Sequence, residues 1–230
     1  MSYIEEQQKV IENLRRLSQS SDSPVSSVPM TESFEDDSNV CLTLLAFVPE
    51  SIHPKLNDVV SKLREAQDCH YFYPCQSYHI TIQNVRRIAS PPSFSEENVE
   101  VARDVFRELL KNKRKFVFHL KGLLLLRTSI SIICYAEDSY KSFIERTRQE
   151  LENNNIPDDK TYVSDKTFFG NITLVRFTHP PDEKLKSAVE SMKELDFGNV
   201  ELEALSLVTT NSVCDMKKTK IIETYKLSMN

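Results

Sequence analysis

A histidine–threonine pair and an asparagine–threonine pair are the residues of this chain whose types and spacing can do chemistry. His79 and Thr81 lie in the stretch YHITI, and Asn171 and Thr173 lie in GNITL, 92 positions later. Both stretches alternate β-branched and polar residues, as short strands do. Because residues i and i+2 of a strand face the same way, each pair shares one face. The two stretches therefore predict a symmetric polar site between two related strands.

The residue types at this predicted site suit a phosphate ester. Cleaving a phosphodiester by water requires one group that accepts a proton and one that donates a proton, and histidine does either near neutral pH. The hydroxyls of Thr81 and Thr173 can donate hydrogen bonds to phosphate oxygens. Asn171 can also donate a hydrogen bond but cannot transfer a proton, and losing one acid–base group costs about 10²–10⁴ in rate. The pattern indicates a slow phosphoesterase, a lyase or transferase that needs one proton carrier, or a binding protein.

A purely structural role for these residues is the competing interpretation. A buried strand histidine with satisfied hydrogen bonds is the ordinary reading of a single match, and the duplicated context is what favours a site at His79. Asn171 as a plain strand residue stays an equal alternative. Arg86 and Arg176, which follow the two motifs, are expected either to contact phosphate or to be solvated and ion-paired.

The elements that must position these residues begin near Asn39. We predict strands over 40–48, 70–73, 116–126, 129–135, 200–208 and 220–227, besides the two motif strands. Helices are predicted over 53–65, from Ser95 to the basic run at 111–115, and over 139–153 and 182–194. Several strands are separated by loops too short for a crossover helix, which favours an α+β fold with antiparallel pairing. Only three glycines are present, and no Gly-rich phosphate loop or G-x-S-x-G motif occurs.

The first 38 residues differ in character from the rest. Apolar residues recur at helical spacing over 3–17, and a serine-rich, acidic stretch that reads as a flexible linker follows. We therefore divide the chain into an N-terminal helix and linker, 1–38, and a folded domain, 39–230. Residues 1–38 carry the whole net charge of −5, so the domain has no overall charge that would indicate nucleic-acid coating. The helix is expected to pack on its own domain or to bind a protein partner.

The composition also indicates in which cellular compartment the protein works and whether it needs a cofactor. Five cysteines, an odd number without a C-x-x-C pair, read as free thiols in a reducing compartment. No apolar run reaches the roughly 18 residues of a membrane helix, and the polar N-terminus predicts no secretory signal. We therefore expect a cytoplasmic monomer without membrane attachment. His70 and Asp68 fit no familiar ligand spacing, so neither a metal nor another cofactor is expected.

The paired motifs resemble those of a known family, the two-histidine phosphoesterases. HITI at 79–82 and NITL at 171–174 occupy the places of that family's two His-x-Thr/Ser motifs. The run TLLAFVP at 43–49 resembles the family's opening strand, and FYP at 72–74 resembles its approach to the first motif. The resemblance covers roughly residues 40–228. Within the family, the chain is most similar to the 2′-5′ RNA ligase-like branch.

The resemblance implies a bilobal α+β fold with two mostly antiparallel sheets, pseudo-twofold symmetry around a central cleft, and helices outside. It implies no metal, and substrates such as 2′,3′-cyclic phosphates and 2′-5′ linkages. His79 would be one of the two acid–base residues, with Thr81 and Thr173 as the hydroxyl pair. Asn171 departs from the family pattern at the second histidine.

Three further residues are expected to touch the substrate, namely Asn171, Arg176 and Tyr78. The function that follows is a phosphodiesterase acting on a nucleotide or RNA-end phosphodiester, with catalysis weakened by Asn171. The alternative is a non-catalytic nucleotide- or RNA-binding module with a degenerate active site.

Overall fold

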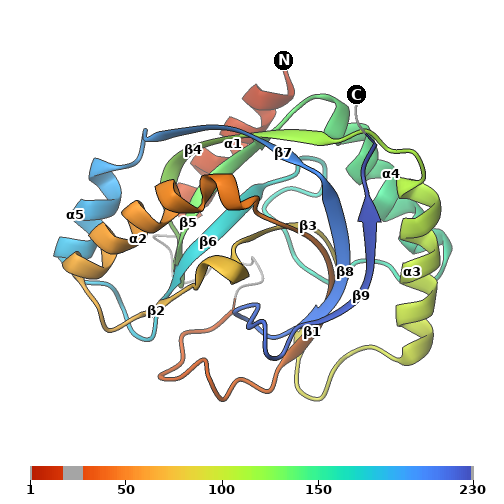
Figure 1. The fold of residues 1–230 in the computed structure, drawn as a ribbon, viewed down its shortest axis with the longest axis horizontal. Coiled ribbons are helices and arrows are strands. Elements are labelled where there is room, and N and C mark those ends of the chain that lie inside the picture. Colours follow the sequence, from red (N-terminus) through yellow and green to blue (C-terminus); the bar gives the residue numbers. More distant parts are fainter. Residues whose placement is uncertain (1, 18–27, 229–230) are drawn as a thin grey trace.

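The computed structural model describes residues 2–17 and 28–228 of the 230-residue chain, and its elements interleave helices and strands (Figure 1). Five α-helices and nine strands are described, together with two short 3₁₀ helices, η1 (Glu50–Ile52) and η2 (Cys75–Ser77). In chain order they are α1 (Tyr3–Leu17), β1 (Val40–Phe47), α2 (His53–Ala66), β2 (Tyr71–Phe72), β3 (His79–Ala89), α3 (Glu96–Leu110), β4 (Phe116–Leu125), β5 (Ser129–Ala136), α4 (Ser139–Asn153), β6 (Gly170–Arg176), α5 (Glu183–Ser191), β7 (Asp196–Leu202), β8 (Ala204–Thr210) and β9 (Lys220–Lys226).

The strands form one sheet, which differs from the expected pair of sheets. The order is β7-β4-β5-β6-β3-β1-β8-β9, with the short β2 added beside β6. Every pairing between these strands is antiparallel. The two halves of the sheet meet at β3 and β6, where one residue pair, Ile80 with Ile172, is in register. A single contact of this kind joins the halves without separating them into two sheets.

The two halves repeat the same arrangement outward from that junction. On one side the order is β3, β1, β8 and β9, and on the other it is β6, β5, β4 and β7. Each half contains a strand–helix–strand unit with antiparallel strands, β1–α2–β3 in the first and β5–α4–β6 in the second. The motif strand is the last strand of each unit. This repetition places the two motif strands side by side at the centre.

The segment predicted as one strand over 200–208 is two strands in different halves. β7 pairs with β4, and β8 pairs with β1, so the chain passes from one half to the other at Glu203. Its carbonyl accepts a hydrogen bond from the Leu227 amide at 2.8 Å. Apolar and polar residues keep alternating through this point, so the local pattern carries no sign of the change of partner. Figure 1 shows β7 crossing the top of the molecule and leading into β8, which descends on the right.

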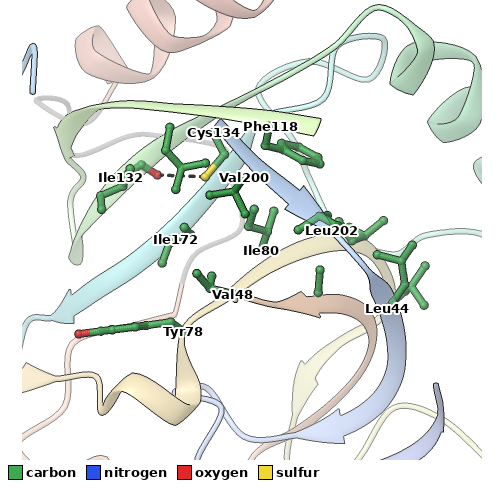
Figure 2. Packing of buried hydrophobic residues seen from close by; sticks show 14 of the residues in the cluster. Leu44, Val48, Tyr78, Ile80, Phe118, Ile132, Cys134, Ile172, Val200 and Leu202 are labelled. Atoms are coloured by element: carbon green, nitrogen blue, oxygen red, sulfur yellow. Dashed lines mark hydrogen bonds between the residues drawn. The ribbon is translucent and has the colours of Figure 1, made fainter. Parts of the chain in front are cut away.

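The core is built from the inward faces of these strands. Ile80 and Ile172 are fully buried, and Figure 2 shows both among the side chains of the core cluster. α2 packs with α5, and α3 packs with α4, at the left and the right of Figure 1. Buried residues of all four helices belong to the same core cluster as Ile80 and Ile172. No helix among the described residues is long and apolar enough to cross a membrane.

The N-terminal helix lies at its predicted place and packs on β5. Gln7 donates from Nε2 to the Ala136 carbonyl at 2.9 Å and accepts from the Ala136 amide at 2.9 Å. Packing before Asn39 is also present, because Phe34 is buried and Asp37 accepts a hydrogen bond from the Ser212 amide at 2.9 Å. The predicted serine-rich linker at 18–27 lies outside the described residues.

Candidate functional site

The polar residues of the two motifs share one face of the sheet. Ile80 is paired with Ile172, and both side chains enter the core. Since neighbouring residues of a strand face opposite ways, His79 and Thr81 on β3 lie on the other face, as do Asn171 and Thr173 on β6. The antiparallel direction sets His79 beside Thr173 and Thr81 beside Asn171. We call this surface, defined by His79, Thr81, Asn171 and Thr173, the motif face.

A β-bulge follows each motif at the same position. On β3 the register with β1 shifts between Thr81 and Gln83, and on β6 the register with β5 shifts between Thr173 and Val175. The extra residue is therefore the one directly after the motif threonine in both halves. A bulge bends the strand and re-aims the side chains beyond it, and bulges are frequent next to active sites. The repetition extends the relation between the two halves from sequence to backbone geometry.

The orientation of His79 is set by its own backbone neighbourhood. Its Nδ1 lies 2.8 Å from the carbonyl oxygen of Ser77, so Nδ1 carries the proton that makes this hydrogen bond. The second ring nitrogen, Nε2, is then left for another partner. The side chain is half-buried, with Tyr73 tilted against it at 6.4 Å between ring centroids. Holding one nitrogen on a carbonyl is how a protein fixes which nitrogen of a histidine acts.

The second partner of His79 is the thiol of Cys214. This cysteine is 1% exposed and sits just beyond β8, where its backbone adopts a φ of 51°, a conformation uncommon outside glycine. It packs against Leu45 and Val208, and it interacts electrostatically with the imidazole of His79.

The Cys214–His79 contact shifts both groups toward the ion pair. Burial lowers the pKa of His79, but the thiol of Cys214 and the Ser77 carbonyl outweigh it, so the pKa stands above its ordinary value. Burial raises the pKa of Cys214, but His79 outweighs it with help from Thr210 and Thr219, so that pKa is lowered. The two directions agree, because an imidazolium and a thiolate stabilise each other. Each shift favours the charged form of its group.

Asn171 is held in a small hydrogen-bonded group. Its Nδ2 donates to Ser131 Oγ at 3.1 Å and to Thr173 Oγ1 at 3.2 Å. Ser131 Oγ in turn donates to Thr173 Oγ1 at 3.3 Å. Ser131 is the β5 neighbour of Thr173 in the register and is fully buried. The amide nitrogen at this position is thus used to orient hydroxyls, a role that needs no proton transfer.

Two cations lie near the motif face. Arg176, at the end of β6, donates from Nε to the Tyr73 hydroxyl at 3.3 Å, and Tyr73 donates to the Ser212 carbonyl at 3.2 Å. Lys160 interacts electrostatically with Arg176, and burial lowers its pKa while Asp158 opposes the change. Within the described part of the chain, no carboxylate lies within 4.0 Å of the charged nitrogens of either residue. Arg176 also acts on His79 and lowers its pKa.

Tyr78 and Arg86, two residues considered for contact with the substrate, have their hydrogen bonds away from the motif face. Tyr78, just before β3, is 1% exposed, and its hydroxyl donates to Asn57 Oδ1 at 3.1 Å. Figure 2 shows it within the core cluster, so this tyrosine supports the strand rather than the motif face. Arg86 donates from Nη1 to the carbonyls of Val85 and Pro157, at 2.7 and 2.8 Å.

Two surface cavities lie away from the motif face. One, of about 450 Å³, is lined by Lys62, Met192 and their neighbours, and the other, of about 420 Å³, by α1 and residues 163–167. Neither of them is the central cleft expected between the halves.

Cys214 and Lys160 are the residues of this site that sequence reasoning missed. Both lie on connections, Cys214 in the turn after β8 and Lys160 between α4 and β6. Neither belongs to a motif or to a periodic pattern, so their nearness to His79 and Arg176 comes only from the way the sheet folds. The odd number of cysteines was the one visible signal, and it did not single out Cys214.

Comparison with known proteins identifies the fold. No protein-family model and no curated protein sequence matches the chain. Among solved structures, TT0787 of Thermus thermophilus is similar with a TM-score of 0.61 and 19% identity, over 81% of this chain and 97% of that one. Escherichia coli LigT complexed with ATP is similar at 0.54 and 14%, over 83% and 98%. A conserved protein of Agrobacterium tumefaciens, ATU0111, is similar at 0.58 and 12%, over 94% and 99%.

These likenesses run through nearly the whole length of each solved protein. At identities of this size they establish architecture and leave the chemistry of individual residues to the geometry above. The chain therefore has an α+β fold that resembles the folds of E. coli LigT and of a protein solved as a phosphoesterase.

Proposed function

We propose that this protein acts on a phosphodiester of a nucleotide or of an RNA end, either a 2′,3′-cyclic phosphate or a 2′-5′ linkage, with catalysis weakened by Asn171. The observation that carries the proposal is the central β3–β6 pairing, which turns His79, Thr81, Asn171 and Thr173 toward the same surface. One proton-carrying ring and two hydroxyls on a single surface suit a group with a negative charge and several acceptor oxygens.

The charges around the motif face favour an anionic ligand. Arg176 and Lys160 repel each other, and neither has a carboxylate within 4.0 Å in the described part of the chain, although Asp158 and Asp159 partly offset the charge of Lys160 from further away. Keeping two like charges together in a partly desolvated place is costly unless an anion accompanies them. A phosphate between them would remove this repulsion and accept hydrogen bonds from the guanidinium.

The likeness in fold favours a nucleotide as the source of that phosphate. E. coli LigT has been solved in complex with ATP, with 3′-AMP, with NADP⁺ and with phosphate. Each of these ligands carries a phosphate group, and three of them are nucleotides. The ligand class transfers to this chain as part of the proposal, together with the fold.

The residues would divide the work as follows. His79, whose pKa is raised by the Cys214 thiol, would donate a proton from Nε2 to the oxygen that leaves phosphorus. Thr81 and Thr173 would donate hydrogen bonds to the non-bridging oxygens. Asn171 cannot accept a proton from the attacking water, so that water would attack without a general base. The missing base costs about 10²–10⁴ in rate.

A non-catalytic nucleotide-binding module is the second candidate, and the contacts of Asn171 favour it. Its amide is committed to Ser131 and Thr173, an arrangement that positions hydroxyls but moves no proton. Under this reading the motif face binds a nucleotide tightly without turning it over.

A single set of measurements separates the two candidates. Turnover of 2′,3′-cyclic nucleotides and 2′-5′ oligoadenylates is compared for the native chain, His79→Ala and Asn171→His, and 3′-AMP binding is measured by calorimetry. Slow native turnover that His79→Ala abolishes and Asn171→His accelerates supports the phosphodiesterase. Binding without turnover, together with activity gained only in Asn171→His, supports the binding module.

The control for this comparison is Tyr78→Phe, because Tyr78 directly precedes β3 but is buried in the core. It should leave both binding and turnover unchanged. The proposal fails if the native chain neither binds nor cleaves any of these nucleotides while remaining folded.

A further inference from the structure

A cluster of one cysteine and two histidines lies where two distant segments meet, apart from the motif face. Cys69 and His70 lie on the connection from α2 to β2, and His179 lies just after β6. One ligand atom from each of the three lies within 4.8 Å of the others, and no other such group occurs in the described ranges 2–17 and 28–228. Cys69 Sγ is 3.3 Å from His179 Nε2, and the two imidazole centroids are 4.9 Å apart.

The hydrogen bonds around His179 determine which of its ring nitrogens carries a lone pair. Thr178 Oγ1 donates to the Cys69 carbonyl at 3.1 Å, so its single proton is used there. The same oxygen lies 2.9 Å from His179 Nδ1 and accepts the proton of that nitrogen. His179 Nε2 therefore carries a lone pair, which lies 3.3 Å from Cys69 Sγ and 3.4 Å from the amide nitrogen of Gln67, an exposed contact that a metal ion would replace. Histidines that bind metals almost always donate their other ring N–H to an oxygen in this way.

A buried nitrogen of His70 without a hydrogen-bond partner is a second, independent indication of a ligand at this cluster. The Nδ1 of His70 lies 3.3 Å from Thr178 Oγ1 and 3.4 Å from the Thr178 amide nitrogen, and the tautomer that donates from Nδ1 to Oγ1 keeps a lone pair on Nε2. Its Nε2 is buried and has no hydrogen-bond partner. Buried polar atoms are nearly always paired, so an orphaned imidazole nitrogen beside a thiol and a second imidazole calls for an additional ligand. A metal ion would relieve this, either directly at Nε2 or by turning the ring.

The spacing fits a tetrahedral ion bound by sulfur and nitrogen. Zinc lies about 2.3 Å from thiolate sulfur and about 2.0–2.1 Å from imidazole nitrogen, so two such ligands are roughly 3.6 Å apart in a tetrahedron. The 3.3 Å between Cys69 Sγ and His179 Nε2 is already close to this value. Cys69 and His179 are exposed, so their side chains have room to close the remaining distance to His70.

We propose that Cys69, His70 and His179 form a zinc site that ties the α2–β2 connection to the segment after β6. The chemistry of the ligands selects the ion, because one thiolate and two neutral imidazoles suit zinc better than magnesium or calcium. Three protein ligands leave the fourth position to water, since the site opens to solvent at two of its three residues. Binding releases the proton of the Cys69 thiol. The ion joins segments that are 110 residues apart in the chain, so it stabilises the fold at this point.

The test uses cobalt as a spectroscopic stand-in for zinc in the full chain. The protein is freed of metal with a chelator and titrated with Co²⁺. We expect near-ultraviolet sulfur-to-cobalt absorption that saturates at one equivalent, with visible bands typical of a tetrahedral ion, and loss of both on addition of Zn²⁺. Zinc should also raise the thermal midpoint. If the native chain shows no sulfur-to-cobalt absorption, the proposal is overturned.

Substitutions at exposed positions keep the test independent of folding. Cys69→Ser should abolish the sulfur-to-cobalt absorption, and His179→Ala should weaken Co²⁺ binding by at least tenfold. Thr178→Val, which removes the oxygen that orients His179, should weaken it by about tenfold. Cys75→Ser is the matched control, because Cys75 is a free thiol outside the cluster. Equal effects of Cys69→Ser and Cys75→Ser would contradict the assignment of the sulfur ligand.

Discussion

Ile80 on β3 and Ile172 on β6 are paired antiparallel at the centre of the sheet, and neither side chain is accessible to solvent. This one pair joins two halves that repeat the same strand order, so it lies on the axis that relates them. Its consequence is chemical as well as structural. Because both isoleucines face the core, the residues on either side of each must face the opposite surface. The motif face is therefore a direct result of burying these two side chains.

Replacing Thr173 by valine should weaken phosphate binding without unfolding the protein. Valine keeps the shape of threonine and removes the hydroxyl, which also accepts from Asn171 Nδ2 and Ser131 Oγ. A hydrogen bond to a charged group is worth about 1.5–3 kcal/mol, so the affinity for 3′-AMP should fall by roughly ten- to a hundredfold. Calorimetry measures the change. Thr209→Val, on β8 and opposite Leu42 in the register, is the control and should bind as the native chain does.

The sequence predicts where the helices and strands lie better than it predicts which strands pair with each other. The apolar alternation located the helices and most strands, because burial of one face is a local property. The choice of β4 for β7 and of β1 for β8 depends on segments far away in the chain, so the break at Glu203 was invisible. The continuous sheet, in place of two, has the same origin, since it depends on one pair between β3 and β6.

The candidate site, too, is predictable where it depends on local sequence and not where it depends on distant segments. The strand periodicity is sufficient to put His79 with Thr81 and Asn171 with Thr173. The residues that set the electrostatics of His79 come from connections, and no pattern in the sequence links Cys214 or Lys160 to either motif. Tyr78 was expected to touch the substrate because it directly precedes His79 in the sequence. Consecutive residues of an extended chain face opposite sides, so this nearness does not bring Tyr78 to the motif face.

Arg176→Gln should reduce anion binding and raise the pKa of His79. The arginine has no carboxylate partner in the described part of the chain, so its charge is available to a phosphate, and losing it should cost at least tenfold in affinity for inorganic phosphate. Arg176 also lowers the pKa of His79, and removing that positive charge favours the imidazolium. Calorimetry and an NMR titration of the imidazole measure the two effects.

The matched control for this arginine is Arg87→Gln, an exposed side chain on the same sheet. It removes the same charge but lies away from the motif face, so neither phosphate affinity nor the His79 titration should change. A fall in affinity that is equal in both variants would show a general loss of positive charge and contradict the role given to Arg176.

Cys214→Ala should shift the titration of His79 to lower pH. In the native chain the thiol helps to hold the pKa of His79 above its ordinary value, so the imidazolium persists until the pH rises through that raised value. Without the thiol, burial and Arg176 both lower the pKa, and only the Ser77 carbonyl opposes them. If His79 donates the proton in catalysis, the alkaline limb of the rate profile moves to lower pH by the same amount.

The measurement is a long-range proton–nitrogen NMR titration of the imidazole nitrogens in both proteins. Cys69→Ser, an exposed cysteine outside the motif face, is the control and should leave His79 unchanged. An unchanged or higher pKa of His79 in Cys214→Ala would rule out the proposed thiol–imidazole coupling.

Gln7→Ala should destabilise the folded protein, although the residue lies in a terminal helix. Its side-chain amide exchanges two hydrogen bonds with the backbone of Ala136 on β5, both at 2.9 Å, and is 2% exposed. Removing it leaves a buried N–H and a buried C=O on β5 without partners, which costs about 1–3 kcal/mol for each unsatisfied group. Gln8→Ala removes the same side chain from the neighbouring, exposed position and should change stability by less than about 0.5 kcal/mol. Urea unfolding of both variants tests whether α1 is part of the folded domain: equal midpoints would mean that the helix detaches without cost, which would free it to bind a protein partner instead.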